Sequence, residues 1–77
     1  MQVTEPILAQ SIETTACELG ILFGDREVRI PWEQCSERLA RASAEQRRCA
    51  QLSPGGYAIR WPLIDEDLSI GGLVKKA

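Results

Sequence analysis

Alternating apolar and polar positions predict a β-hairpin in the first half of the chain. Every second residue from 17 to 23 is apolar, so a strand over these residues would present one apolar face. A return strand over Glu27–Ile30 alternates in the same way, and the residues between the two runs begin with Gly-Asp, which favours a tight turn. A further strand is expected over Leu8–Thr15. The chain is therefore expected to be mainly β-structure up to Pro31, because proline cannot donate to a β-ladder.

Helical spacing follows this proline. Apolar residues recur at intervals of three and four, which predicts one helix from about Trp32 to Ala42. Ser43 and Gln46 have the spacing of a capping box, so a second short helix is expected over Ala44–Cys49. The break at Ser43 leaves two short helices or one kinked helix as alternatives.

Strand spacing returns in the last third of the chain. Residues 52–56 contain Ser-Pro-Gly-Gly and are expected to form a loop. Tyr57–Trp61 is expected to form a strand that ends before a proline, and residues 64–68 are expected to be extended. Residues 69–74 would form a terminal turn or a brief helix, with the serine at 69 as its N-cap.

The order of these elements predicts an α+β fold in a single domain over residues 1–77. We expect a small, mainly antiparallel sheet, built from the N-terminal hairpin and the C-terminal strand and packed against one or two short helices. Residues 1–6 and 75–77 are expected to be loose. A chain of 77 residues buries only about 60% of its unfolded surface, so the expected core is thin.

Composition removes most catalytic and metal-binding chemistry from consideration. The chain has no histidine to act as a base or a zinc ligand, and Gly55-Gly56 is not followed by the Lys-Ser/Thr of a phosphate-binding loop. We therefore predict no catalytic residue, no cofactor and no metal. The three cysteines, Cys17, Cys35 and Cys49, are an odd and scattered set, so they are expected to be buried thiols of a protein in a reducing compartment.

Charge and hydropathy indicate a cytoplasmic protein without a membrane segment. The first six residues lack the basic and apolar regions of a signal peptide, and the longest apolar stretch is only a few residues. The net charge of −2 gives no overall attraction for nucleic acid.

The second half of the chain resembles a bacterial family of unknown function. The resemblance to domain-of-unknown-function family 2442 covers about residues 10–74, and its most specific part is the block 55–62 joined to residues 65–69. The strand-turn-strand of the predicted hairpin also matches the opening of that family. The resemblance implies a small α+β domain of unestablished biochemical role. Members often lie beside small toxin-like or helix-turn-helix proteins, which suggests antitoxin or accessory roles.

A run of acidic residues and two aromatic residues are the candidate contacts for a protein partner. Asp65, Glu66 and Asp67 are consecutive, and on a strand the two aspartates would share one face. Such carboxylates form a solvated edge, cap nearby N–H groups, bind a basic partner or supply two ligands to a divalent metal ion. Tyr57 and Trp61 either fill the thin core or anchor an interface.

Four arginines offer the alternative of nucleic-acid binding. Arg38, Arg41, Arg47 and Arg48 lie in and around the predicted helices, where they could contact phosphate. Three glutamates interleave with them, so the surface is mixed in sign and is also typical of a solvated helix face.

The sequence thus favours a non-catalytic protein-binding module, antitoxin-like or a small inhibitor that docks on a larger protein complex. An accessory domain that binds nucleic acid through the four arginines is the alternative. A homodimer formed through an uncovered sheet edge is also compatible with so thin a core.

Overall fold

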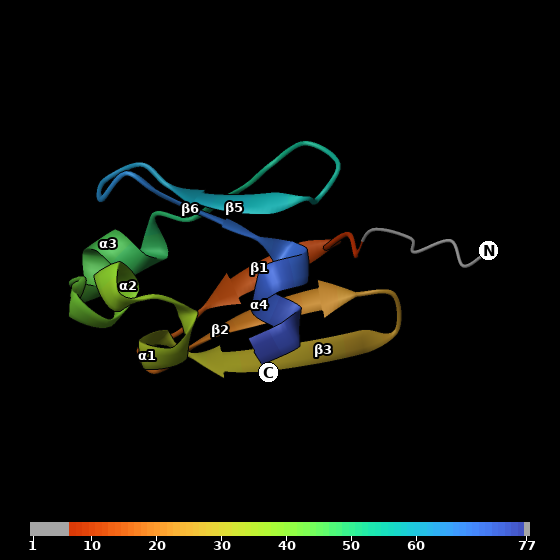
Figure 1. Cartoon of the computed structure of the whole chain (residues 1–77), viewed down its shortest axis with the longest axis horizontal. Helices are drawn as coiled ribbons and strands as arrows, with labels where there is room; N and C mark the ends of the chain where they lie inside the picture. The colour runs from red at the N-terminus through yellow and green to blue at the C-terminus, as the bar shows by residue number, and fades with distance from the viewer. Residues whose placement is uncertain (1–6, 77) are drawn as a thin grey trace.

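The computed structural model describes residues 7–76 (Figure 1). The prediction that residues 1–6 and residue 77 are loose therefore lies outside the described residues. Two three-stranded antiparallel sheets and short helices make up this part of the chain, which confirms the α+β prediction. The first sheet has the order β1-β2-β3 and consists of Ser11–Thr14, Glu18–Phe23 and Arg26–Pro31. The predicted hairpin is its β2–β3 pair, in which Phe23 lies opposite Arg26.

A second sheet, rather than an extension of the first, holds the C-terminal strand. Its order is β4-β5-β6, and its strands are Gln51–Leu52, Ala58–Trp61 and Glu66–Ser69. β4 was not predicted: Leu52 is the first residue of the expected loop, and Gln51 precedes it. In β4, Leu52 pairs with Ile59 and Gln51 pairs with Arg60. The single sheet that we expected is therefore two, because β5 has partners on both sides within its own half of the chain.

The helix predicted from Trp32 to Ala42 is two helices, α1 (Trp32–Cys35) and α2 (Glu37–Arg41). Ser36 interrupts it with an extended backbone, φ −167° and ψ 162°, and its hydroxyl accepts the N–H of Leu39 as the N-cap of α2. The apolar spacing continues across this break, so the prediction of one helix was wrong although the buried stripe was right.

Two predicted helix starts are present. α3 (Ala44–Arg48) begins with the capping box of Ser43 and Gln46. α4 (Ile70–Lys76) begins after Ser69, whose hydroxyl accepts the N–H of Gly72. Residues 75 and 76, expected to be loose, belong to α4, and the Lys76 ammonium donates to the carbonyl oxygen of Cys35 at 3.0 Å.

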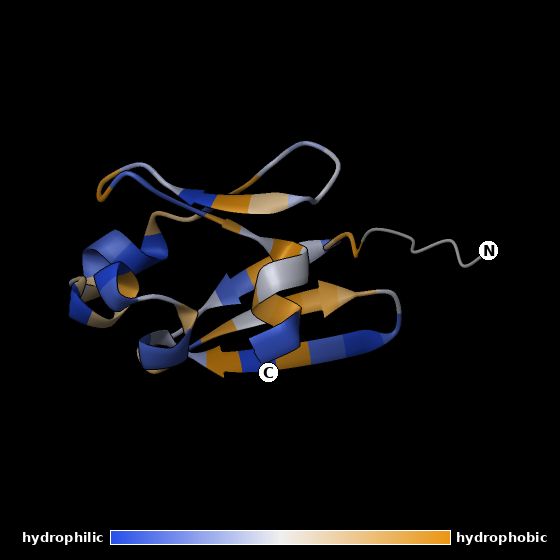
Figure 2. Cartoon of the chain, in the orientation of Figure 1, coloured by the Kyte–Doolittle hydropathy of each residue, from blue (hydrophilic) through white to orange (hydrophobic). Residues whose placement is uncertain are grey.

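The core lies between the two sheets and the helices. Its fully buried side chains come from β2, β3, β5, α1, α2 and α4: Leu19, Ile21, Ile30, Trp32, Cys35, Leu39, Ile59, Trp61, Ile70 and Leu73. The rings of Trp32 and Trp61 meet edge to face, with centroids 6.3 Å apart. α2 and α3, at one end of the molecule, are mostly hydrophilic (Figure 2). None of the helices formed by residues 7–76 has the length and apolar character needed to cross a membrane.

Gly56 joins the segment before β1 to the loop before β5. Its carbonyl oxygen accepts the N–H of Ala9, and its φ of +77° lies in the left-handed region. A Cβ atom at this position would collide with the backbone of Ala9. Glycine is therefore required here by both conformation and space.

Only one of the three cysteines is buried, which corrects the expectation that all three are. Cys35 is inaccessible in α1, whereas Cys17 and Cys49 are exposed. Burial raises the pKa of the Cys35 thiol from 9.0 to about 11, while the nearby charge of Lys76 opposes the shift.

We expect two of the three thiols to react with 5,5′-dithiobis(2-nitrobenzoic acid) in the native protein at pH 8. The third, Cys35, should react only after unfolding, because it is buried and remains protonated at this pH. Absorbance of the released thionitrobenzoate counts the thiols, and Cys35→Ala should leave the native count at two.

Because the folded-state pKa of Cys35 is raised, its contribution to stability should be fully present below pH 9 and be lost as the pH rises toward 11.

Candidate docking face on the second sheet

β5 is the central strand of the second sheet and divides its side chains between two faces. Ile59 and Trp61 point into the core, whereas Arg60 is exposed on the opposite face and Ala58 is half-buried there. The register places Gln51 and Asp67 on either side of Arg60. We call this outward side of β4, β5 and β6, with the turn at Asp65, the docking face.

Arg60 draws two of the three predicted acidic residues together. Its Nη1 lies 2.8 Å from Asp67 Oδ2, and its Nη2 lies 3.1 Å from Asp65 Oδ1. The hydrogen bond to Asp67, followed by the charge of the same residue and the hydrogen bond to Asp65, raises the pKa of the Arg60 guanidinium. Two carboxylates thus share one cation, and this group of three has a net charge of −1.

The two aspartates reach Arg60 from different backbone positions. Asp67 lies on β6 directly opposite Arg60, whereas Asp65 lies in the turn before β6 with a φ of +50°. They are therefore not paired residues on one strand face, as the sequence suggested. Their side chains are 84% and 60% exposed for Asp65 and Asp67 respectively, so both remain accessible to a partner.

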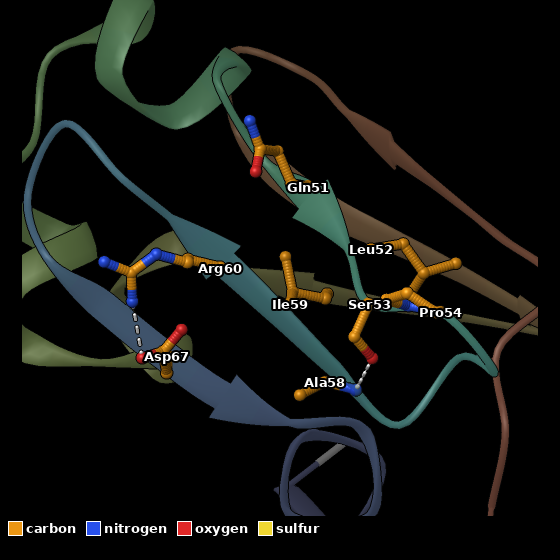
Figure 3. A pocket seen from close by; sticks show the side chains of 8 residues that line it. All are labelled: Gln51, Leu52, Ser53, Pro54, Ala58, Ile59, Arg60 and Asp67. Atoms are coloured by element: carbon orange, nitrogen blue, oxygen red, sulfur yellow. Dashed lines mark hydrogen bonds and ion pairs between the residues drawn. The ribbon is translucent and has the colours of Figure 1, made fainter.

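A groove of about 280 Å³ lies beside this charged group (Figure 3). Gln51, Arg60 and Asp67 line its polar part, and Leu52, Pro54, Ala58 and Ile59 line its apolar part. The small side chain of Ala58 leaves room in the row next to Arg60. Ser53 closes the loop beside the groove, because its hydroxyl accepts the N–H groups of Tyr57 and Ala58.

The two aromatic candidates have opposite placements. Tyr57 is 58% exposed just before β5, so it remains available for a contact. Trp61 is 0% exposed, and its Nε1 donates to the carbonyl oxygen of Arg47 at 3.2 Å. The role of Trp61 as an interface anchor is therefore wrong, because the inward alternation of β5 places its ring in the core.

The four candidate arginines do not form one basic surface. Arg47 turns inward and donates to the carbonyl oxygens of Leu39 and Ala40, both at 2.9 Å. Arg38 donates from α2 to two carbonyl oxygens of the turn before β6. Arg41 pairs with Glu37 at 2.9 Å, and Arg48 is exposed at the end of α3. Two of the four guanidinium groups therefore bind backbone carbonyl groups within the fold.

A second charged group, which sequence reasoning missed, covers the outer side of the first sheet. Arg29 on β3 lies 2.9 Å from a carboxylate oxygen of Glu13, and Glu18 and Glu27 each lie 3.3 Å from the same guanidinium. Gly20 lies beneath it, where an added Cβ would be 3.6 Å from Arg29 Nη1. The glycine at position 20 was the signal available in the sequence, because a glycine within a strand marks close packing on that face.

Within residues 7–76, no group of three or more histidine, cysteine, aspartate or glutamate side chains is placed so that it could hold a metal ion. Asp65 and Asp67 instead have a guanidinium between them.

Comparisons with known proteins place the fold in a family without assigning it an activity. The model of a family described as protein of unknown function (DUF2442) matches residues 11–77. The structure is similar to that of a protein of unknown function from Rhodospirillum rubrum, with a TM-score of 0.77 and 20% sequence identity, over 92% of this chain and 88% of that chain. Identity this low shows a common fold alone. A search of curated proteins finds no match.

Proposed function

We propose that this chain, which belongs to the DUF2442 family of proteins of unknown function, is a non-catalytic module that binds another protein through its docking face. The observation that supports the proposal is the groove of about 280 Å³ beside two exposed carboxylates that share one arginine. Apolar lining next to a few placed polar groups is typical of a binding surface.

The charges of the docking face favour a basic partner. Asp65 and Asp67 exceed Arg60 by one negative charge, and the whole chain carries a net charge of −2. A lysine or arginine of the partner would complete this group, while an apolar side chain of the same partner would enter the groove. Exposed carboxylates of this kind steer association and select the partner more than they add affinity.

This mode of action fits an antitoxin-like protein or a small inhibitor that docks on a larger protein complex. The proposal places the protein in the cytoplasm, where the exposed thiols of Cys17 and Cys49 would stay reduced. Nucleic-acid binding has less support, because Arg38 and Arg47 already donate to backbone carbonyl groups.

The proposal is tested with a partner that is captured on the immobilised chain, identified by mass spectrometry and then purified. Binding measured by calorimetry should weaken about tenfold or more, equal to about 1.4 kcal/mol, for Ala58→Phe, which fills the groove. Asp65→Asn/Asp67→Asn should weaken binding by a similar factor, and the loss should be smaller at high salt.

Glu37→Gln is the matched control, because Glu37 forms an exposed ion pair on α2, away from the groove. This variant should bind like the wild type. Equal affinity for all three variants would contradict the proposed docking face. Turnover of a substrate that disappeared in the double asparagine variant would show instead that the protein is an enzyme.

A further inference from the structure

The edge of the second sheet carries unpaired backbone groups. β6 is the outermost strand, and the N–H of Ile70 donates to the carbonyl oxygen of Tyr57 at 2.8 Å, just beyond the β5–β6 ladder. Because hydrogen-bonded pairs alternate along an antiparallel ladder, Leu68 bonds toward β5, whereas the N–H and C=O of Asp67 point away from it. The N–H of Ser69 points away from β5 for the same reason.

A mostly apolar hollow of about 220 Å³ lies next to this edge. It is lined by Leu68 and Ser69 at the end of β6 and by Gly72, Leu73 and Lys76 of α4. The three α4 residues lie on one side of that helix, at spacings of one, three and four residues. Gly72 lies in the wall of the hollow, and a Cβ at this position would lie 2.8 Å from the Ser69 hydroxyl.

We infer that β6 accepts one extended segment of the partner protein as an additional antiparallel or parallel strand. This inference rests on the proposed function and specifies how the partner binds. The segment would exchange backbone hydrogen bonds with Asp67 and Ser69, and one apolar side chain opposite Leu68 would enter the hollow beside α4. Strand addition of this kind obtains affinity from the main chain and specificity from pockets for alternate side chains.

The charge of Asp67 determines which residue of the added segment is favoured opposite it. A side chain opposite Asp67 would lie on the docking face and extend the row Gln51, Arg60, Asp67 by one position. Opposite charges directly across a pair of strands stabilise the pair, so a lysine or arginine is favoured there. The recognised segment therefore alternates an apolar residue with a basic one.

The length of the segment is limited at one end by α2. Arg38 donates to the carbonyl oxygens of Ile64 at 3.2 Å and Asp65 at 2.9 Å, so it already occupies the edge just before β6. Pairing is thus confined to Glu66–Ser69. A second copy of the chain is a poorer occupant, because a symmetric antiparallel pair centred on Asp67 would set two carboxylates against each other.

The inference is tested with peptides selected on the immobilised full-length chain from a phage-displayed library of random twelve-residue sequences. Each selected peptide is synthesised, and its affinity is measured by fluorescence anisotropy after methylation of one backbone nitrogen at a time. Strand addition predicts a loss of tenfold or more at every second nitrogen and little change at the nitrogens between them. The selected sequences should alternate basic and apolar residues.

Two glycine variants locate the contact. Gly72→Leu, which fills the hollow, should weaken binding at least tenfold, whereas Gly71→Leu should bind like the wild type, because a Cβ at Gly71 meets nothing within 4 Å. Thermal unfolding of both variants checks that they are folded. The methylation scan uses the unaltered chain, so its result does not depend on whether the variants fold. Selection on Asp67→Lys should enrich acidic residues in place of basic ones.

Several outcomes would overturn the inference. The first is a methylation scan in which the loss of affinity does not alternate along the peptide. The second is peptide binding that weakens with Ala58→Phe but not with Gly72→Leu. The third is a library that yields no binding sequence. A dimer in sedimentation equilibrium that Gly72→Leu dissociates would assign the edge to a second copy instead. Each of these results leaves the proposed function standing if the purified partner still requires the docking face. Loss of that requirement would remove both.

Discussion

Trp61→Ala is expected to lower the free energy of unfolding by about 3–5 kcal/mol, the usual cost of truncating a buried tryptophan. The side chain is fully buried, meets Trp32 edge to face, and donates its indole N–H to the carbonyl oxygen of Arg47. Its removal opens a cavity and leaves that carbonyl group without this donor. A domain of this size is stable by only about 4–12 kcal/mol, so the substitution should remove at least about a quarter of the stability.

Urea denaturation followed by far-ultraviolet circular dichroism measures this loss, because the signal does not depend on the tryptophan itself. Tyr57→Ala is the matched control from the same segment, since Tyr57 is more than half exposed and its truncation should cost no more than about 0.5 kcal/mol. Similar losses for both variants would contradict the buried position of Trp61. The pair also separates the two roles that the sequence allowed for the aromatic residues of β5 and its flank.

The parts of the fold that the sequence predicted are those that depend on short-range pattern. Alternation identified the β2–β3 hairpin and the inward face of β5, and the Ser43–Gln46 spacing identified α3. The break at Ser36 could not be read in the same way, because the apolar stripe from Trp32 to Ala42 continues across it. β4 has only two residues, which is too short for any period to be visible.

The candidate site was predictable in composition but not in arrangement. The acidic run is visible in the sequence, yet its neutralising partner, Arg60, lies across the β5–β6 pair, where only the register of the folded strands brings the groups together. The groove beside Arg60 also depends on the position of Ala58 on β5, because its small side chain leaves space there. On the first sheet, by contrast, the guanidinium of Arg29 lies over Gly20 and occupies the corresponding space.

This contrast bears on which face of the molecule binds a partner. Both sheets carry an outward arginine that pairs with two or more carboxylates. On the first sheet, Arg29 covers Gly20. On the second sheet, Arg60 does not cover Ala58, which lines the groove. An entering side chain therefore has space already available on the second sheet, and would have to displace a multiply paired guanidinium on the first.

Arg47→Ala is expected to lower the free energy of unfolding by about 2–3 kcal/mol. Arg47 donates to two carbonyl oxygens at the end of helix α2: that of Leu39, which also accepts the N–H of Ala42, and that of Ala40. Its guanidinium also lies 5.6 Å from the ring centroid of Trp32, so the charge contacts an aromatic face. Hydrogen bonds to charged groups contribute about 1.5–3 kcal/mol, and a carbonyl group left half-buried without a donor adds to the loss.

Arg48→Ala, the adjacent exposed arginine, is the control and should change stability by no more than about 0.5 kcal/mol. Arg47→Lys should recover little of the lost stability, since a single ammonium group cannot donate to both carbonyl oxygens with the geometry of the planar guanidinium. Urea denaturation of the three variants at constant salt gives the comparison. If Arg47→Ala were as stable as Arg48→Ala, the inward role of Arg47 would be wrong, and its guanidinium would again be available for the phosphate contacts that the sequence first suggested.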